Sequence, residues 1–337
     1  MIRNLQSLRG IAAILIFYHH YFGPTYRFTA SFGDLGVVFF MMLSGFVTAL
    51  SVNKKIERNL PLPSVKKFMM GRLLKIYPQY LIFWLAAIVF LPYSGTLLGK
   101  CLGILMLQSW VPVPSIYFSG NAVAWFISDL FFCYLLFIPL MRLIFLGNRI
   151  TRRLFLLIYF TVYFLTVAFI PGEYVHAIVY INPVMQLSNF ILGMLLCKAY
   201  IHIRSNEKDY SLLRYGIIPY LLSISIIVVI IQCYIYKDVP ERLSYGCYWW
   251  LIVGVIILTS SLTDKCQTVF SRIIHNRFLL WIGSVSFTFY LIHYIAIKNW
   301  SLYFHSHHLM TGMAQSFALI LILFGICYVM PGCKPKG

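Results

Sequence analysis

Long apolar runs separated by short basic loops dominate this sequence and most constrain its fold. A helix needs about 20 consecutive apolar residues to cross the hydrocarbon core of a bilayer. Ten such runs follow one another, at residues 5–23, 33–52, 73–93, 122–146, 153–171, 178–200, 215–236, 245–262, 278–297 and 312–331. Only 11% of the residues are charged, whereas soluble domains have about 25%. The sequence therefore predicts an all-α, polytopic integral membrane protein with about ten transmembrane helices.

An eleventh apolar run, residues 95–111, is ambiguous because it contains three glycines, a lysine and a glutamine and is followed by two prolines. When this run is not counted as a membrane span, 22 of the 27 Lys and Arg residues fall on one side of the membrane. Cytoplasmic loops carry such an excess of basic residues. This predicts cytoplasmic termini, a re-entrant or interfacial segment at 95–111 that faces outward, and one transmembrane domain over residues 1–337.

The net charge of +18 does not indicate a nucleic-acid partner, because the basic residues collect in the loops between spans, as is usual for membrane proteins. The eight cysteines form no C-x-x-C pair, which argues against a zinc site. The stretch HSHHL, residues 305–309, has closely spaced histidines. No carboxylate or cysteine accompanies them, and we therefore expect no metal.

Ionisable residues inside the predicted spans are candidates for a functional site, because placing them in lipid is costly. Of the nine acidic residues, only Asp129 lies well within a span. In the first span, Arg9 and His20 are eleven residues apart, which places them on one helix face with an axial separation of about 16 Å. Arg72 and Lys75, at the start of the third span, form an i, i+3 pair that faces one way.

These residues fall into two levels of the predicted membrane. The three cations share the cytoplasmic end, where they suit a polyanionic ligand. Asp129 shares the outer half with His20 and His293, where imidazole can transfer protons near neutral pH. Structural roles are equally compatible with these residues, because arginines extend to lipid headgroups and histidines at span ends form hydrogen bonds. These residues alone are compatible with either of two functions, a membrane enzyme or a transporter.

Five stretches resemble motifs of the acyltransferase 3 family of integral membrane acyltransferases. In LQSLRGIAAILIFYHH, His20 follows Arg9 by eleven residues, as in the family's first-span motif. The other four, in chain order, are GDLGVVFFMMLSGFV, FMMGRLLKIYPQY, AWFISDLFFCYLL and IGSVSFTFYLIHY. The resemblance covers nearly the whole chain. Among its departures from the family pattern, Lys75 stands for an arginine and Asp129 for a glutamate.

The resemblance implies a stand-alone O-acyltransferase, most often an O-acetyltransferase, of the bacterial cytoplasmic (inner) membrane. It implies that an acyl group moves from cytoplasmic acetyl-CoA, or another acyl-CoA, to a hydroxyl of an extracytoplasmic glycan or lipid-linked glycan. O-antigen, capsule and exopolysaccharide are such acceptors. Arg9, Arg72 and Lys75 would then bind the phosphates of CoA, and membrane lipids would surround the protein. The oligomeric state is open.

In the predicted reaction, His20 is the general base that takes the acceptor's hydroxyl proton. Asp129 orients the imidazole if folding brings the two together. Ser44 and Tyr77 are candidate hydrogen-bond donors to the oxyanion or simply helix-packing residues, and Ser44 as a covalent nucleophile is a less favoured variant. A transporter or flippase of an envelope precursor is the alternative from another class. Peptidoglycan and small metabolites are alternative acceptors.

Overall fold

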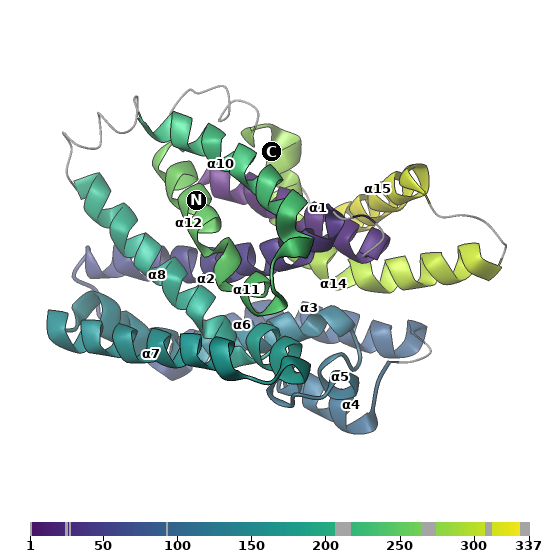
Figure 1. Ribbon diagram of the computed structural model, residues 1–337, viewed down its shortest axis with the longest axis horizontal. Coiled ribbons are helices and arrows are strands. Elements are labelled where there is room, and N and C mark those ends of the chain that lie inside the picture. The colour runs from purple at the N-terminus through teal and green to yellow at the C-terminus, as the bar shows by residue number, and fades with distance from the viewer. Residues whose placement is uncertain are drawn as a thin grey trace.

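Every regular element in the described residues is a helix (Figure 1). The computed structural model describes residues 2–23, 26, 28–91, 94–205, 217–264, 274–306 and 312–330. The α-helices are α1 (Arg3–Phe22), α2 (Phe32–Ile56), α3 (Val65–Phe90), α4 (Leu97–Ile104), α5 (Pro114–Tyr117), α6 (Trp125–Met141), α7 (Arg149–Phe169), α8 (Pro183–Ser205), α10 (Ile217–Ile235), α11 (Glu241–Ser244), α12 (Trp250–Leu262), α14 (Arg277–Ser306) and α15 (Met313–Val329). The prediction of an all-α fold is confirmed.

Seven helices are long and apolar enough to cross a membrane, namely α2, α3, α6, α7, α8, α10 and α14. The apolar helices α12 and α15 are shorter, and α1 carries Arg9 and two histidines among its 20 residues. The chain is therefore a multi-pass membrane protein. The count of ten spans and the cytoplasmic position of both termini stay predictions.

The segment at residues 95–111 does not cross a membrane. Its helix α4 has eight residues and is therefore about 12 Å long, well short of the hydrocarbon core of about 30 Å. Two tyrosines of α3 hold it. Tyr77 donates its hydroxyl hydrogen bond to the Ile104 carbonyl (3.1 Å), and Tyr80 donates to the Gly103 carbonyl (2.6 Å). The outward placement of this segment stays a prediction.

Several helix starts differ from the predicted ones, and local interactions of the backbone explain two of them. Helix α3 begins at Val65, eight residues before the predicted 73, because Ser64 Oγ accepts a hydrogen bond from the Lys67 backbone (3.2 Å). Helix α8 begins at Pro183 instead of 178. Proline lacks an N–H and disfavours the helical conformation in the preceding residue. That residue, Asn182, accepts a hydrogen bond from the Val184 backbone (2.9 Å).

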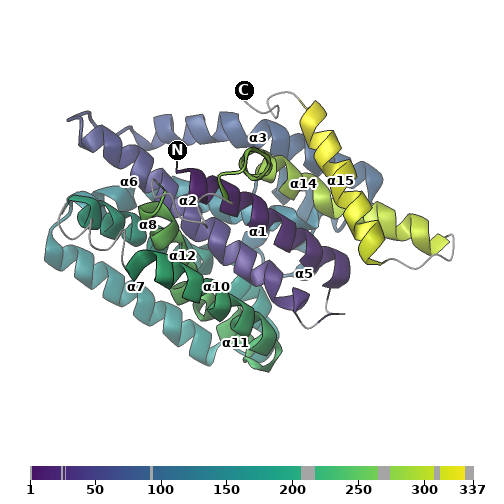
Figure 2. The ribbon, with the colours of Figure 1, turned by 90° about the horizontal axis from the view of Figure 1, so that it is seen from above.

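Glycines bring the central helices into backbone contact. A Cβ added to Gly283 of α14 would lie 1.8 Å from the Gln6 carbonyl oxygen of α1, and one added to Gly10 would lie 2.9 Å from the Gly283 nitrogen. Helices α2 and α8 meet similarly, because a Cβ on Gly193 would lie 1.9 Å from the Met42 carbonyl oxygen. Small residues allow membrane helices to approach closely. Figure 2 shows α1 beside α2, with α14 on its other side.

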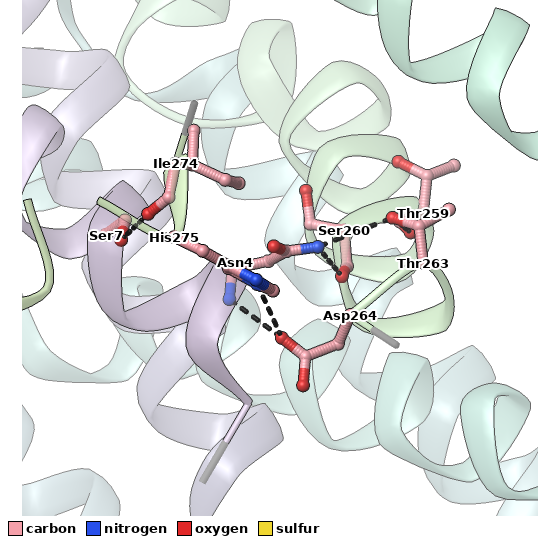
Figure 3. A network of polar contacts seen from close by, with 8 residues as sticks. All are labelled: Asn4, Ser7, Thr259, Ser260, Thr263, Asp264, Ile274 and His275. Atoms are coloured by element: carbon pink, nitrogen blue, oxygen red, sulfur yellow. Dashed lines mark hydrogen bonds and ion pairs between the residues drawn. The ribbon is translucent and has the colours of Figure 1, made fainter. Parts of the chain in front are cut away.

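A polar network fixes the first turn of α1 to the end of α12 (Figure 3). The Asn4 backbone donates to Asp264 Oδ1 (2.9 Å), and the Asn4 side chain donates to the Ser260 carbonyl (2.9 Å). His275 Nε2 lies 3.6 Å from the same Asp264 oxygen. Ser7 donates to the carbonyl of Ile274. The network holds the start of α1 in place, and α1 carries Arg9 and His20.

We expect Gly283→Ala to destabilise the protein by about 1–3 kcal/mol, the usual cost of overpacking, because backbone atoms leave no room for the methyl group. Gly325→Ala on α15 is the matched control, since nothing lies within 4 Å of its added Cβ. It should be neutral or stabilise by up to about 1 kcal/mol. Thermal unfolding of the two variants in the same detergent compares them. Equal stabilities would refute the close contact between α1 and α14.

Candidate active site

His20 lines a cavity of about 680 Å³, which we call the histidine cavity. His19 also lines it from α1, Trp125 from the start of α6, and Tyr294 and Lys298 from α14. Its volume lies within the range of about 300–1,000 Å³ that is typical of ligand sites. Helices from distant parts of the sequence therefore enclose His20 in a space that can hold a small molecule or one end of a larger one.

A second histidine, His293 of α14, lies directly beside His20. The two ring centroids are 5.2 Å apart. His293 is buried, and its Nδ1 lies 2.6 Å from the Tyr290 carbonyl oxygen. Because a carbonyl only accepts hydrogen bonds, Nδ1 carries the hydrogen and Nε2 of the neutral ring has a free lone pair. That Nε2 is buried and has no hydrogen-bond partner among the described residues.

The adjacent His19 has a different environment. Its ring packs on Gly33 of α2, where an added Cβ would lie 2.8 Å from the imidazole. Its Nδ1 lies 3.3 Å from the Thr29 carbonyl oxygen. The two histidines thus diverge. His19 is held against α2, whereas His20 faces α14, with Tyr294 as a second ring neighbour at 5.4 Å.

Asp129 is fully buried, and neither of its carboxylate oxygens has a hydrogen-bond partner among the described residues. The predicted hydrogen bond between Asp129 and His20 is therefore not formed. The physical reason is that α1 packs along α14, so the imidazole of His20 meets His293 instead. Asp129 lies one turn, about 6 Å, along α6 from Trp125. Its other neighbours include the Ser109 hydroxyl and Tyr290.

Two of the three predicted cations come together around Tyr134 of α6. The Arg72 guanidinium lies 4.8 Å from the centre of the Tyr134 ring, and one of its nitrogens lies 3.4 Å from Thr48 Oγ1. Arg9 lies near the same tyrosine. We call Arg9, Arg72 and Tyr134 the basic end. No carboxylate of the described residues lies within 4 Å of either guanidinium. Lys75 is exposed on α3 and contributes no such contact.

The basic end and the histidine cavity lie at opposite ends of the same two helices. Along α1, Arg9 and His20 are about 16 Å apart. Along α6, which runs in the opposite direction, Trp125 and Tyr134 are about 14 Å apart. Asp129 lies between these two levels. The structure therefore keeps the cations and the histidine at a separation that suits a long ligand with one anionic end.

Ser44 and Tyr77 lie away from His20. Ser44 is eleven residues along α2 from Gly33, which contacts His19, and this corresponds to about 16 Å. The structure thus does not place His20 as a base for a Ser44 nucleophile. Tyr77 is about 21 Å along α3 from Leu91, which lines the histidine cavity. Its single O–H is donated to the Ile104 carbonyl, and this contact fixes α4.

Aromatic residues continue outward from the histidine cavity. The Trp125 ring lies 5.0 Å from that of Tyr180, and Phe118 lies 6.0 Å from His176. The Tyr117 hydroxyl and His176 Nδ1 are 3.1 Å apart. Burial lowers the pKa of His176, so its imidazole is neutral at pH 7. Trp125 and Phe118 themselves line the histidine cavity.

The aromatic residue Trp110 does not line the cavity. Trp110 packs edge-on against Phe132, with ring centroids 4.8 Å apart, and Tyr93 lies outside the described residues. The described part of the chain contains no cluster of three or more His, Cys, Asp or Glu residues that could hold a metal. His307 and His308 of the HSHHL stretch lie outside it.

Sequence reasoning missed Tyr294 and Lys298 as cavity residues. Lys298 Nζ lies 5.4 Å from the centre of the Tyr294 ring, and both line the histidine cavity. The sequence feature that could have identified them is their spacing: Tyr290, Tyr294 and Lys298 follow one another at i, i+4 positions and so share one face of α14. In the sequence, the charge of Lys298 lies near the end of an apolar span, where a lysine is expected for topology alone.

Comparison with known proteins shows the family of this chain. The sequence profile of the acyltransferase 3 family, described as an acyltransferase domain, matches residues 2–330. The chain belongs to the acyltransferase 3 family. Acyltransferase MdmB of Streptomyces mycarofaciens is 26% identical over 369 residues, which cover 98% of this chain and 88% of that protein. No solved structure gives a significant match. The protein is therefore a membrane acyltransferase, and the matched region contains both the basic end and the histidine cavity.

Proposed function

We propose that this acyltransferase is an O-acetyltransferase that uses cytoplasmic acetyl-CoA and acetylates a hydroxyl of a cell-envelope glycan. One observation carries the proposal. His20 lines an open cavity, and Arg9 on the same helix face joins a cluster of cations about 16 Å away. The distribution of basic residues supports a bacterial cytoplasmic membrane location with the basic end inside and the histidine cavity outside.

The basic end suits the anionic part of the donor. CoA carries several phosphates at one end and a thiol at the end of a long pantetheine arm. Guanidinium groups bind phosphates in bidentate fashion, and Arg9 and Arg72 have no carboxylate partner among the described residues. With the phosphates there, the arm would run between α1 and α6 past Asp129. The acyl thioester would then reach His20.

The reaction requires one proton acceptor. His20 removes the proton from the acceptor hydroxyl, and the oxygen attacks the thioester carbonyl carbon. The new C–O bond forms, the C–S bond breaks, and the proton passes from the imidazolium to the leaving CoA thiolate. The acceptor sugar would lie in the histidine cavity, where Trp125 and Phe118 offer flat apolar surfaces.

His293 takes the positioning role that the sequence suggested for Asp129. Its Nε2 lone pair is buried beside His20 and lacks a partner among the described residues. If it accepts a hydrogen bond from one nitrogen of His20, the other nitrogen is left unprotonated toward the substrates. The Tyr290 carbonyl holds His293 itself in the tautomer that this requires.

We expect His20→Ala to lower acetyl transfer by about 10²–10⁴-fold, the usual contribution of a positioned base. His19→Ala removes the same side chain one position earlier and should keep most of the activity, because His19 packs on α2. The measurement is mass spectrometry of envelope glycans from cells with matched membrane levels of each variant. A full acetyl signal with His20→Ala would exclude His20 as the base.

We expect His293→Leu to lower kcat while the KM for acetyl-CoA stays unchanged, because an apolar residue cannot orient His20. His293→Gln keeps a hydrogen-bond acceptor at this position and should recover part of the rate. A merely structural role would instead lower thermal stability in both variants without this difference. Steady-state kinetics in nanodiscs, with CoA release as the readout, separates the two results.

We expect Arg72→Gln to raise the KM for acetyl-CoA by about 10–100-fold, the range for a lost charged hydrogen bond. S-acetylpantetheine, which lacks the phosphates, is the matched donor and should react equally with wild type and variant. Lys75→Gln should have a smaller effect, because Lys75 is exposed. Equal losses with both donors would show that Arg72 supports the fold instead of binding phosphate.

A further inference from the structure

A second, smaller cavity of about 210 Å³ adjoins His20 at the end of α1. Five side chains with polar groups contribute to its lining, namely those of His20, Tyr21, Lys298, Trp300 and Ser301. His20 and Lys298 also line the histidine cavity. A molecule whose hydroxyl approaches His20 from the histidine cavity can therefore place a neighbouring substituent in the smaller one.

The lining of both cavities carries a positive charge without a compensating negative charge. Lys298 has the only formally charged side chain among the described residues that line them, and no aspartate or glutamate is present there. No described carboxylate lies within 4 Å of its ammonium group. Lys298 is exposed, and it gives the cavity lining a net positive charge, which favours an anionic ligand.

Trp300 adds an unsatisfied donor beside this charge. Its indole Nε1 is buried and has no hydrogen-bond partner among the described residues. The Tyr21 hydroxyl oxygen lies near this N–H but outside hydrogen-bond geometry, and it donates its own proton to the Gly312 carbonyl (3.4 Å). Buried donors without partners are rare and require an explanation, and an acceptor atom of a bound ligand supplies one. The Ser301 hydroxyl is a further donor in the lining.

We propose that the smaller cavity is an anion subsite and that the acceptor carries a carboxylate or phosphate next to the hydroxyl that is acylated. Lys298 pairs with the anion, and Ser301 and Trp300 lie beside it as hydrogen-bond donors. The statement about the acceptor rests on the proposed function, whereas the subsite itself is a binding property. The acceptor class is then an acidic sugar or a sugar phosphate.

One alternative role for Lys298 follows from the position of α1. This helix ends at Phe22, beside the smaller cavity, and its last carbonyls carry a partial negative charge. Lys298 could simply neutralise that helix end. Loss of Lys298 would then lower thermal stability without changing which ligands bind.

The test compares charged and neutral sugars that differ in one group. Methyl β-glucuronide, methyl β-glucoside 6-phosphate and methyl β-glucoside are equilibrated with the protein in nanodiscs, and bound sugar is measured by equilibrium dialysis. We expect one of the two charged sugars to bind at least about tenfold more tightly than the glucoside, the range for a charged hydrogen bond. The preferred sugar distinguishes carboxylate from phosphate.

Three variants complete the test. Lys298→Gln should abolish the preference and leave glucoside affinity unchanged, Lys298→Arg should retain it, and Lys100→Gln on α4 is the control lysine outside both cavities. Equal or undetectable binding of charged and neutral sugars by wild type overturns the subsite. A preference that survives Lys298→Gln, or a variant that loses only thermal stability, also overturns it.

Acetyl transfer from acetyl-CoA, measured in the same nanodiscs, separates this inference from the proposed function. A charge preference without acetyl transfer supports the subsite and counts against the proposed reaction. Acetyl transfer without a charge preference supports the reaction and overturns the subsite.

Discussion

The backbone contact between Gly10 and Gly283 determines the geometry of the site. With no Cβ on either residue, α1 and α14 approach until the added Cβ of Gly10 would lie 2.9 Å from the Gly283 nitrogen. His20 is ten residues after Gly10, and His293 is ten residues after Gly283. Equal numbers of residues give equal rises of about 15 Å along two helices that run side by side in the same direction. The two imidazoles therefore arrive at the same level, with ring centroids 5.2 Å apart.

The contact between Gly10 and Gly283 also explains the distance between the basic end and the histidine cavity. Arg9 precedes Gly10 directly, so the guanidinium lies at the level of the helix contact and the imidazole of His20 lies about three turns away. Helix α6 repeats this separation in the opposite direction, from Trp125 at the cavity to Tyr134 at the cations. A rigid pair of helices thus sets the length of ligand that can contact both ends, without a contribution from loops.

Much of this arrangement follows from the sequence, because helical period and rise act within one helix. The apolar runs predicted the long helices, and the eleven-residue spacing placed Arg9 and His20 on one face. Which side chains meet across two helices could not be predicted from the sequence. The imidazole meets His293 and not Asp129, because the choice depends on which helix the glycines bring close. Tyr77 matched a family motif, but its hydroxyl bonds to Ile104, in a segment whose position no periodicity encodes.

The two departures from the family pattern have unequal consequences in this structure. Lys75 is exposed, so its ammonium stays hydrated. It makes no contact with the basic end, so the basic end does not lose the bidentate geometry of an arginine at this position. Asp129 is different, because its shorter side chain is buried with both oxygens unpaired among the described residues. Burying a carboxylate without hydrogen-bond partners is energetically costly. In the proposed function, amide groups of the donor's arm would be its hydrogen-bond partners, and the histidines would carry the proton transfer.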